Sequence, residues 1–161
     1  MQITIRRARA EDAALLAELN TEIQQMHADS VPKYFKNADP QNPALIDDYA
    51  RRLSDEHTYI FIAEADSQPV GSLVLVHRQI EENPYAVANT RLIIDQISVN
   101  ASHRGKGVGH AFVEQAKALC KSLHVDYLQL NVWAFNAQAI EFYKREGFEN
   151  VSLQMWQKMK D

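Results

Sequence analysis

Apolar side chains recur at the spacing of an α-helix in four segments, at residues 10–26, 44–55, 108–123 and 136–148. In the first segment they form one continuous stripe: Ala13, Leu16, Leu19, Ile23 and Met26. A candidate N-cap, Asp12, precedes this stripe, and Gly147 marks the end of the fourth segment, as glycine commonly does after a helix. These patterns predict four amphipathic helices.

Period-two alternation and short runs of β-branched or aromatic residues predict six strands. They occupy residues 3–8, 59–65, 70–78, 91–99, 126–133 and 149–159. The turn-forming residues 66–69 between the second and third strands predict an antiparallel hairpin. The polar residues 79–90 predict a loop or an extension of the neighbouring strands.

The predicted elements follow the order β-α-α-β-β-β-α-β-α-β. Several successive strands followed by helical crossovers predict an α/β (α+β) protein, with a mixed central sheet flanked by about four helices. The chain has 161 residues and no internal repeat or linker. We therefore expect residues 1–161 to form a single domain.

Composition excludes several classes of function. The chain is 46% hydrophobic and 24% charged, and no apolar run has the length of a membrane span. Its formal net charge of -4 gives no general attraction to nucleic acid. The N-terminal residues lack the apolar core of a secretory signal, and the single cysteine, Cys120, cannot form an internal disulfide. We expect a cytoplasmic protein, and since the six histidines show no metal-ligand spacing we expect no metal.

A glycine-rich stretch at residues 104–110 connects the strand that ends at Val99 to the third predicted helix. The N–H groups at a helix N-terminus favour an anion, and Arg104 and Lys106 add positive charge. The alternative is a tight turn that needs only the positive φ of glycine. The P-loop fails to match because no lysine followed by a hydroxyl residue ends this stretch. The G-x-G-x-x-G dinucleotide fingerprint fails because the glycines here form G-x-G-x-G.

Two motifs resemble the GNAT superfamily of N-acetyltransferases. Arg104, Gly107 and Gly109 give the R-x-x-G-x-G pattern of its acetyl-coenzyme A (acetyl-CoA) loop. The later family motif, N-x-x-A-x-x-F-Y-x-x-x-G-F, is matched by six residues: Asn136, Ala139, Phe142, Tyr143, Gly147 and Phe148. The motifs stand in the family's order, separated by a helix and a strand. The resemblance covers nearly the whole chain and implies a GNAT-like fold, with a splay between two parallel strands.

The resemblance implies acetyl-CoA as cosubstrate, bound at two adjoining places. Backbone amides of the loop would hold its pyrophosphate: Arg104, Gly105, Lys106, Gly107, Val108, Gly109 and His110. The pantetheine arm would pair with the strand edge that the splay leaves open, at Ile97, Ser98 and Val99. Asn136 and Tyr143 are further expected contacts, and Asn136 is also a candidate helix cap.

The implied reaction is direct attack of a primary amine on the thioester within a ternary complex, and the amine must first lose a proton. Asp95 stands where many family members have glutamate and shares the side-chain parity of Ile97 and Val99. We expect it to act as base through water, and the alternative is a carboxylate paired with an arginine such as Arg91. Tyr143 matches the tyrosine that protonates the leaving thiolate, and the alternative is a core aromatic.

In the family the amine acceptor, a small molecule or a peptide, enters opposite the coenzyme. We expect His27, Tyr34, Phe35 and Tyr85 to line its site, although a lone histidine at a helix end is also typical of a cap or surface residue. The resemblance further implies a homodimer formed by the C-terminal strands and nearby edges. An alternative from another class is a non-catalytic coenzyme A (CoA) binding sensor or partner-binding module with the same fold.

Overall fold

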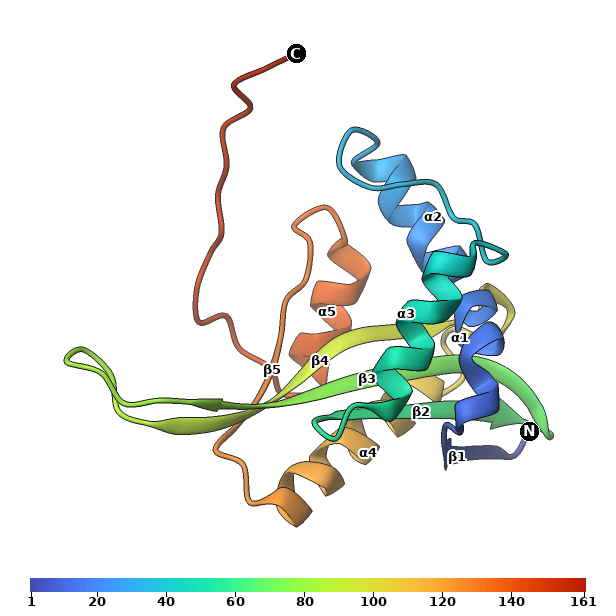
Figure 1. Ribbon diagram of the computed structural model, residues 1–161, viewed down its shortest axis with the longest axis horizontal. Helices are drawn as coiled ribbons and strands as arrows, with labels where there is room; N and C mark the ends of the chain where they lie inside the picture. Colours follow the sequence, from blue (N-terminus) through green and yellow to red (C-terminus); the bar gives the residue numbers. More distant parts are fainter. The chain divides into compact units, whose positions relative to one another are not determined.

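The computed structural model describes residues 1–161 as two compact units, Met1–Asn131 and Val132–Asp161. The larger unit holds a five-stranded sheet in the order β1-β2-β3-β4-β5 (Figure 1). Its strands are β1 Ile3–Arg7, β2 Thr58–Ala65, β3 Gln68–Ile80, β4 Asn89–Val99 and β5 Tyr127–Leu130. The first four strands pair antiparallel, and β5 pairs parallel with β4. The sheet is therefore mixed, as predicted.

Four helices belong to the larger unit: α1 Ala13–Leu19, α2 Thr21–Ser30, α3 Pro43–Ser54 and α4 Val108–Leu123. The smaller unit contains α5 Ala137–Arg145. The start of α3 follows from its sequence, because Asn42 Oδ1 accepts a hydrogen bond from the Ala44 N–H at 3.0 Å and Pro43 occupies the first turn. No helix combines the length and the apolar character that crossing a bilayer requires.

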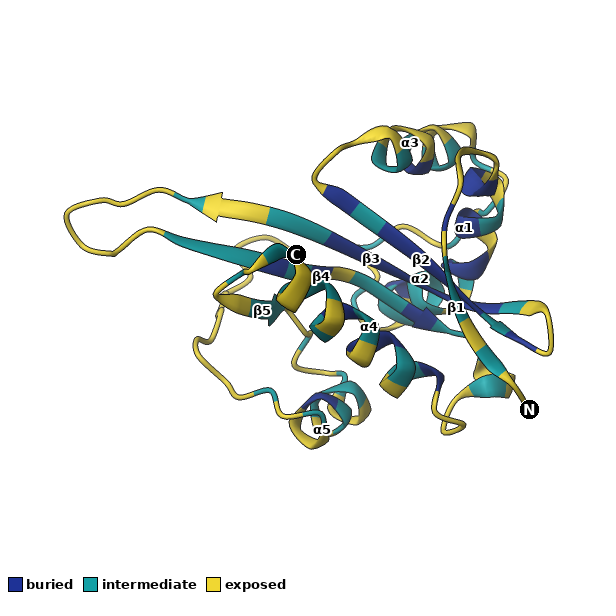
Figure 2. Cartoon of the chain, turned by 90° about the horizontal axis from the view of Figure 1, so that it is seen from below, coloured by how far each residue is buried: buried dark blue, intermediate teal, exposed yellow.

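The helices of the larger unit cover both faces of its sheet (Figure 2). On one face α1 and α3 pack against β2 and β3, and Leu16, Tyr49, Ile60 and Val74 are at most 1% exposed there. On the other face α4 lies close to β3, where a Cβ atom at Gly71 would come within 3.2 Å of Phe112. Since alternate strand residues point to opposite faces, Gly71 and Val74 mark the two sides of β3.

The predicted helix over residues 10–26 is divided in two. A short 3-10 turn at Ala10–Asp12 precedes α1, and α1 and α2 are separated at Asn20. At this break the Leu19 carbonyl accepts a hydrogen bond from Ser98 Oγ at 2.9 Å, and Ser98 Oγ lies 3.1 Å from Ser72 Oγ. A buried pair of hydroxyl groups therefore connects the break to β3 and β4, which the helical spacing could not indicate.

The predicted last strand, residues 149–159, is wrong, because residues 146–161 form no helix or strand. Val151, Leu153 and Met155 alternate as the sequence suggested, yet each is at least 84% exposed. Alternation provides an apolar face, but a strand also needs a partner for its backbone N–H and C=O groups. Both predicted alternatives for the polar residues 79–90 occur, because residues 79–80 extend β3, residues 89–90 extend β4, and residues 81–88 connect the two strands.

We expect Gly71→Ala to destabilise the protein by about 1–3 kcal/mol, the typical cost of overpacking. A Cβ atom at this position would lie 2.4 Å from the Ser98 carbonyl oxygen, so that β3 and β4 would have to separate. Urea unfolding of the variant measures the loss. Gln68→Ala, at the exposed start of the same strand, is the control and should stay within about 0.5 kcal/mol of wild type. Equal stability of the Gly71 variant and wild type would contradict the close approach.

Candidate active site

The β4 strand continues beyond the end of its neighbour. The β4–β5 ladder runs from the pair Arg91 and Tyr127 to the pair Ile94 and Leu130, and β5 ends there. β4 extends five residues further, to Val99, paired with β3 on its other side. We call Asp95–Val99 the open edge of β4. This is the splay between two parallel strands that the family resemblance implied.

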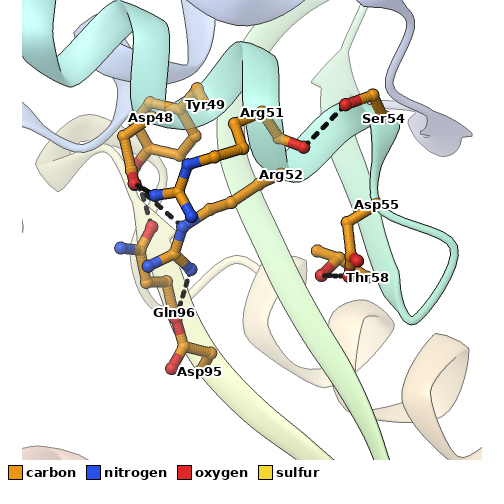
Figure 3. A network of polar contacts seen from close by, with 9 residues as sticks. All are labelled: Asp48, Tyr49, Arg51, Arg52, Ser54, Asp55, Thr58, Asp95 and Gln96. Carbon is orange, nitrogen blue, oxygen red and sulfur yellow. Dashed lines mark hydrogen bonds and ion pairs between the residues drawn. The ribbon is translucent and has the colours of Figure 1, made fainter.

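A β-bulge lies at the beginning of the open edge. In the β3–β4 ladder Val74 pairs with Gln96 and Leu75 pairs with Ile94, so Asp95 has no partner across the ladder. Both Asp95 and Gln96 consequently contact α3: Asp95 Oδ2 accepts from Arg52 Nη1 at 2.6 Å, and Gln96 Oε1 accepts from the Tyr49 hydroxyl at 2.7 Å (Figure 3). The expected shared parity of Asp95 with Ile97 and Val99 is wrong, because the extra residue of the bulge reverses it.

Asp95 forms an ion pair with Arg52, whereas the sequence suggested Arg91. Arg52 also donates from Nε to Asp48 Oδ2 at 2.9 Å, and Asp48 is paired in addition with Arg51 (Figure 3). Burial opposes the charge on Arg52, but the two carboxylates raise its pKa overall. The Asp95 side chain is 40% exposed, so water can reach the carboxylate while Arg52 fixes its orientation.

Tyr49 and Arg91 form further hydrogen bonds to residues of β4. Burial raises the pKa of Tyr49 to about 12, so its hydroxyl stays protonated and donates to Gln96. Arg91 donates to Asn89 Oδ1 and Gln129 Oε1, both at 2.8 Å, and so connects β4 with β5 before the splay begins.

The three predicted pantetheine-contacting residues differ in what they can offer. The Ser98 side chain is buried and its hydroxyl is engaged by Leu19 and Ser72, so only its backbone is available to a ligand. Ile97 and Val99 are half-buried. The Val99 carbonyl accepts a hydrogen bond from Arg104 Nε at 3.0 Å.

The glycine-rich turn, residues 104–107, leads from the open edge into α4. Gly105 has φ +72° and Gly107 has φ +90°, in the left-handed region that favours glycine. A Cβ atom would meet nothing within 4 Å at Gly105 and only Ile3 Cδ1, at 3.9 Å, at Gly107. Backbone conformation therefore explains the glycines, and crowding does not. No side chain caps α4, so its first N–H groups are suited to an anion.

Two cations accompany this turn. Lys106 is exposed, and Arg104 forms an ion pair with Glu22 of α2, with 3.2 Å between Arg104 Nη2 and Glu22 Oε2. The two positive charges and the first N–H groups of α4 therefore lie on one continuous segment, formed by Arg104, Lys106, Val108, Gly109 and His110. Glu22 could not be predicted from the sequence, because its partner Arg104 lies 82 positions away.

Three of the four predicted acceptor residues lie together. His27 stacks on Phe35 with 5.0 Å between ring centroids, and Tyr34 meets Phe35 edge-on at 4.9 Å. Burial lowers the pKa of His27, which favours a neutral imidazole at pH 7. Tyr85 is 98% exposed in the connection between β3 and β4, a hairpin that extends well beyond the helices (Figure 1). The 11 residues of β4 span roughly 33 Å from that connection to the glycine-rich turn, so Tyr85 does not join the other three.

The smaller unit holds the second predicted motif. Asn136 caps α5, because its Oδ1 accepts from the Ala139 N–H at 3.1 Å. Tyr143 is 8% exposed, with its ring centroid 5.1 Å from that of Phe142 and 5.6 Å from that of Phe148. Burial raises the pKa of the Tyr143 hydroxyl, which therefore stays protonated. Cys120 of α4 is half-buried, and burial raises the pKa of its thiol, as expected of a structural cysteine.

Solved structures share this fold. A protein of Bacillus halodurans superposes with a TM-score of 0.90 at 21% identity, over 97% of this chain and 99% of the other. An aminoglycoside N-acetyltransferase in complex with CoA gives a TM-score of 0.76 at 17% identity, over 99% and 96% of the two chains. At these identities the likeness establishes the fold.

Sequence comparisons establish the family. A streptothricin acetyltransferase of Streptomyces lavendulae is 39% identical over 64 residues, 40% of this chain but only 34% of that protein. A peptidyl-lysine N-acetyltransferase of Salmonella typhimurium is 27% identical over 150 residues, 92% of this chain and 85% of the other. The model of the acetyltransferase (GNAT) family matches residues 20–148, which include the open edge of β4, the glycine-rich turn and the α5 motif. The chain therefore belongs to the acetyltransferase (GNAT) family.

Proposed function

We propose that the protein transfers the acetyl group of acetyl-CoA to a primary amine of a small molecule or peptide, by direct attack in a ternary complex. The open edge of β4 carries this proposal, because it leaves backbone groups without a β5 partner immediately before the glycine-rich turn. Residues 1–161 would act as one acetyltransferase domain, since the family match extends across both compact units.

The coenzyme would bind along β4 and its continuation into α4. Its pantetheine amides would pair with backbone groups at Ile97, Ser98 and Val99, as a peptide does when it adds to a sheet edge. The pyrophosphate would accept hydrogen bonds from the uncapped N–H groups that begin α4, with Arg104 and Lys106 supplying charge. Asn136 would be a further contact through its amide N–H₂, since its Oδ1 caps α5.

The chemical step needs a base for the amine and an acid for the leaving group. The amine nitrogen would form a bond to the thioester carbonyl carbon, and the C–S bond would break as the tetrahedral intermediate collapses. Asp95 would take the amine proton through water, and Arg52 would hold the carboxylate for this role. Tyr143 would donate its proton to the departing thiolate, since burial keeps the phenol protonated. A backbone N–H of the open edge would stabilise the intermediate's oxyanion.

The acceptor would bind beside His27, in the last turns of α2, and Tyr34 and Phe35, which follow that helix, since their rings form one cluster. The relatives named for streptothricin and peptidyl-lysine acetylation support an amine, and the net charge of -4 is compatible with a cationic one. A neutral His27 could accept a proton from the amine, although Asp95 is the proposed base. Tyr85 has no place in this acceptor site, because it lies at the far end of β4.

We also propose a homodimer in the cytoplasm. Apolar side chains of the C-terminal segment are 84–88% exposed, and a second copy would cover them: Val151, Leu153, Met155 and Met159. Exposed contiguous apolar surface is typical of association sites.

Thiol release from acetyl-CoA with pooled acceptors tests the proposed reaction. The pools are polyamines, amino acids, aminoglycosides, streptothricin and lysine peptides, with a no-acceptor control. We expect release with at least one pool and an acetylated amine, of matching mass, in that sample. CoA binding is measured by calorimetry on the same protein. Binding without release from any pool would favour the non-catalytic sensor, and absence of binding would refute both.

Tyr143→Phe should lower turnover by about 100-fold or more, the usual contribution of a positioned general acid. The ring remains, so contacts to Phe142 and Phe148 and the affinity for CoA should be retained. Steady-state kinetics and calorimetry measure the two effects. Tyr127→Phe, which removes an exposed hydroxyl on β5, should leave both unchanged. Wild-type turnover in the Tyr143 variant would exclude this residue as the acid.

Asp95→Asn should lower turnover roughly tenfold or more without an equal loss of stability, because the amide cannot accept the amine proton. Asp48→Asn is the matched control, since it removes the other carboxylate that Arg52 contacts. Turnover and urea unfolding are compared for both variants. If the two variants lose turnover to the same extent, Asp95 serves only to hold Arg52, and the proposed base is wrong.

A further inference from the structure

Glu22 connects α2 with the segment that follows β4. Its Oε2 atom accepts a hydrogen bond from the Ala101 N–H at 2.7 Å, and Arg104 Nη2 lies 3.2 Å from the same oxygen. One carboxylate oxygen thus accepts from the first residue of the short 3-10 turn Ala101–His103 and from the side chain of Arg104, which follows that turn. Neither GNAT motif of the sequence contains Glu22.

Two hydrogen bonds fix the orientation of the Arg104 guanidinium group. Nε donates to the Val99 carbonyl at 3.0 Å, and Nη2 donates to Glu22. These contacts use two of the five N–H donors of a guanidinium group, so three are left for a ligand. Arg104 is the first residue of the glycine-rich turn and immediately precedes Gly105, whose φ is positive.

Stability alone does not account for this ion pair. The side chains of Arg104 and Glu22 are 42% and 48% exposed, and pairs this exposed contribute about 0–1 kcal/mol. A carboxylate placed near an anion site would also repel the anion if Arg104 did not neutralise it. The geometry is better explained by orientation, because an arginine already held in one conformation loses less entropy when it binds a ligand.

We propose that Glu22 is a positioning residue for the coenzyme, acting through Arg104 and the Ala101 N–H on the part of the site that holds the diphosphate. This inference rests on the proposed function. Glu22 itself touches no reacting atom. Glu22 and His27 lie on the same helix, α2, so the contacts of Glu22 would also hold the proposed acceptor-binding residues in place relative to the glycine-rich turn.

Donors with and without a diphosphate separate this role from simple packing of α2. The KM values for acetyl-CoA and for S-acetylpantetheine, which lacks the diphosphate and the nucleoside, are measured at a saturating acceptor concentration. Glu22→Ala should raise the KM for acetyl-CoA roughly three- to tenfold, the scale of one side chain that must be ordered on binding. The KM for S-acetylpantetheine and kcat should stay at wild-type values. Glu22→Gln should show a smaller rise, because its amide oxygen can still accept from Ala101.

Glu114→Ala is the matched control, because Glu114 forms a comparably exposed ion pair with Lys117 on α4. It should leave both KM values unchanged. An equal rise for both donors in Glu22→Ala would show that Glu22 only packs α2, and an unchanged or lower KM for acetyl-CoA would show that it does not orient Arg104. Either result overturns the inference.

Calorimetry of wild-type protein with CoA and with pantetheine is done first, and it separates this inference from the proposed function. If the wild type binds CoA but acetylates nothing, the proposed reaction fails, and the same comparison is made with the two dissociation constants. If the wild type does not bind CoA, both proposals fail together.

Discussion

The site depends on one constraint, which is that β4 continues for five residues after β5 has ended. A strand inside a sheet satisfies its backbone groups on both sides, so a strand edge without a partner needs water or a ligand. In this chain the edge leads directly into a turn with two positive-φ glycines and then into the uncapped end of α4. A ligand with an amide-containing arm and an anionic group matches that order of donors and acceptors.

The bulge at Asp95 determines which side chains accompany the open edge. An extra residue places Asp95 and Gln96 both in contact with α3, while Ser98 uses its hydroxyl to hold the break between α1 and α2. The polar side chains of the edge therefore contact the helices, while its backbone has no β5 partner. This division explains why β4 can carry aspartate, glutamine and serine over its last five residues.

The sequence predicted the parts of this site that depend on local chemistry. The positive-φ glycines, the cap at Asn136 and the splay followed from residue type or from the family motifs. The bulge could not be predicted, because period-two parity assumes that no extra residue interrupts the ladder. Arg52 and Asp95 are 43 positions apart, so their ion pair depends on the packing of α3 on the sheet. The C-terminal alternation predicted a strand but contained no information about a pairing partner.

The two ends of the open edge are held in the same physical way. At its start Arg52 of α3 binds Asp95, and at its end Arg104 binds the Val99 carbonyl and Glu22 of α2. Both arginines are ion-paired with carboxylates, Arg52 with Asp95 and Arg104 with Glu22. Their common effect is geometric, because planar guanidinium groups fix direction as well as distance. The ladder with β3 and these two arginine contacts therefore fix the position of the strand segment that has no β5 partner.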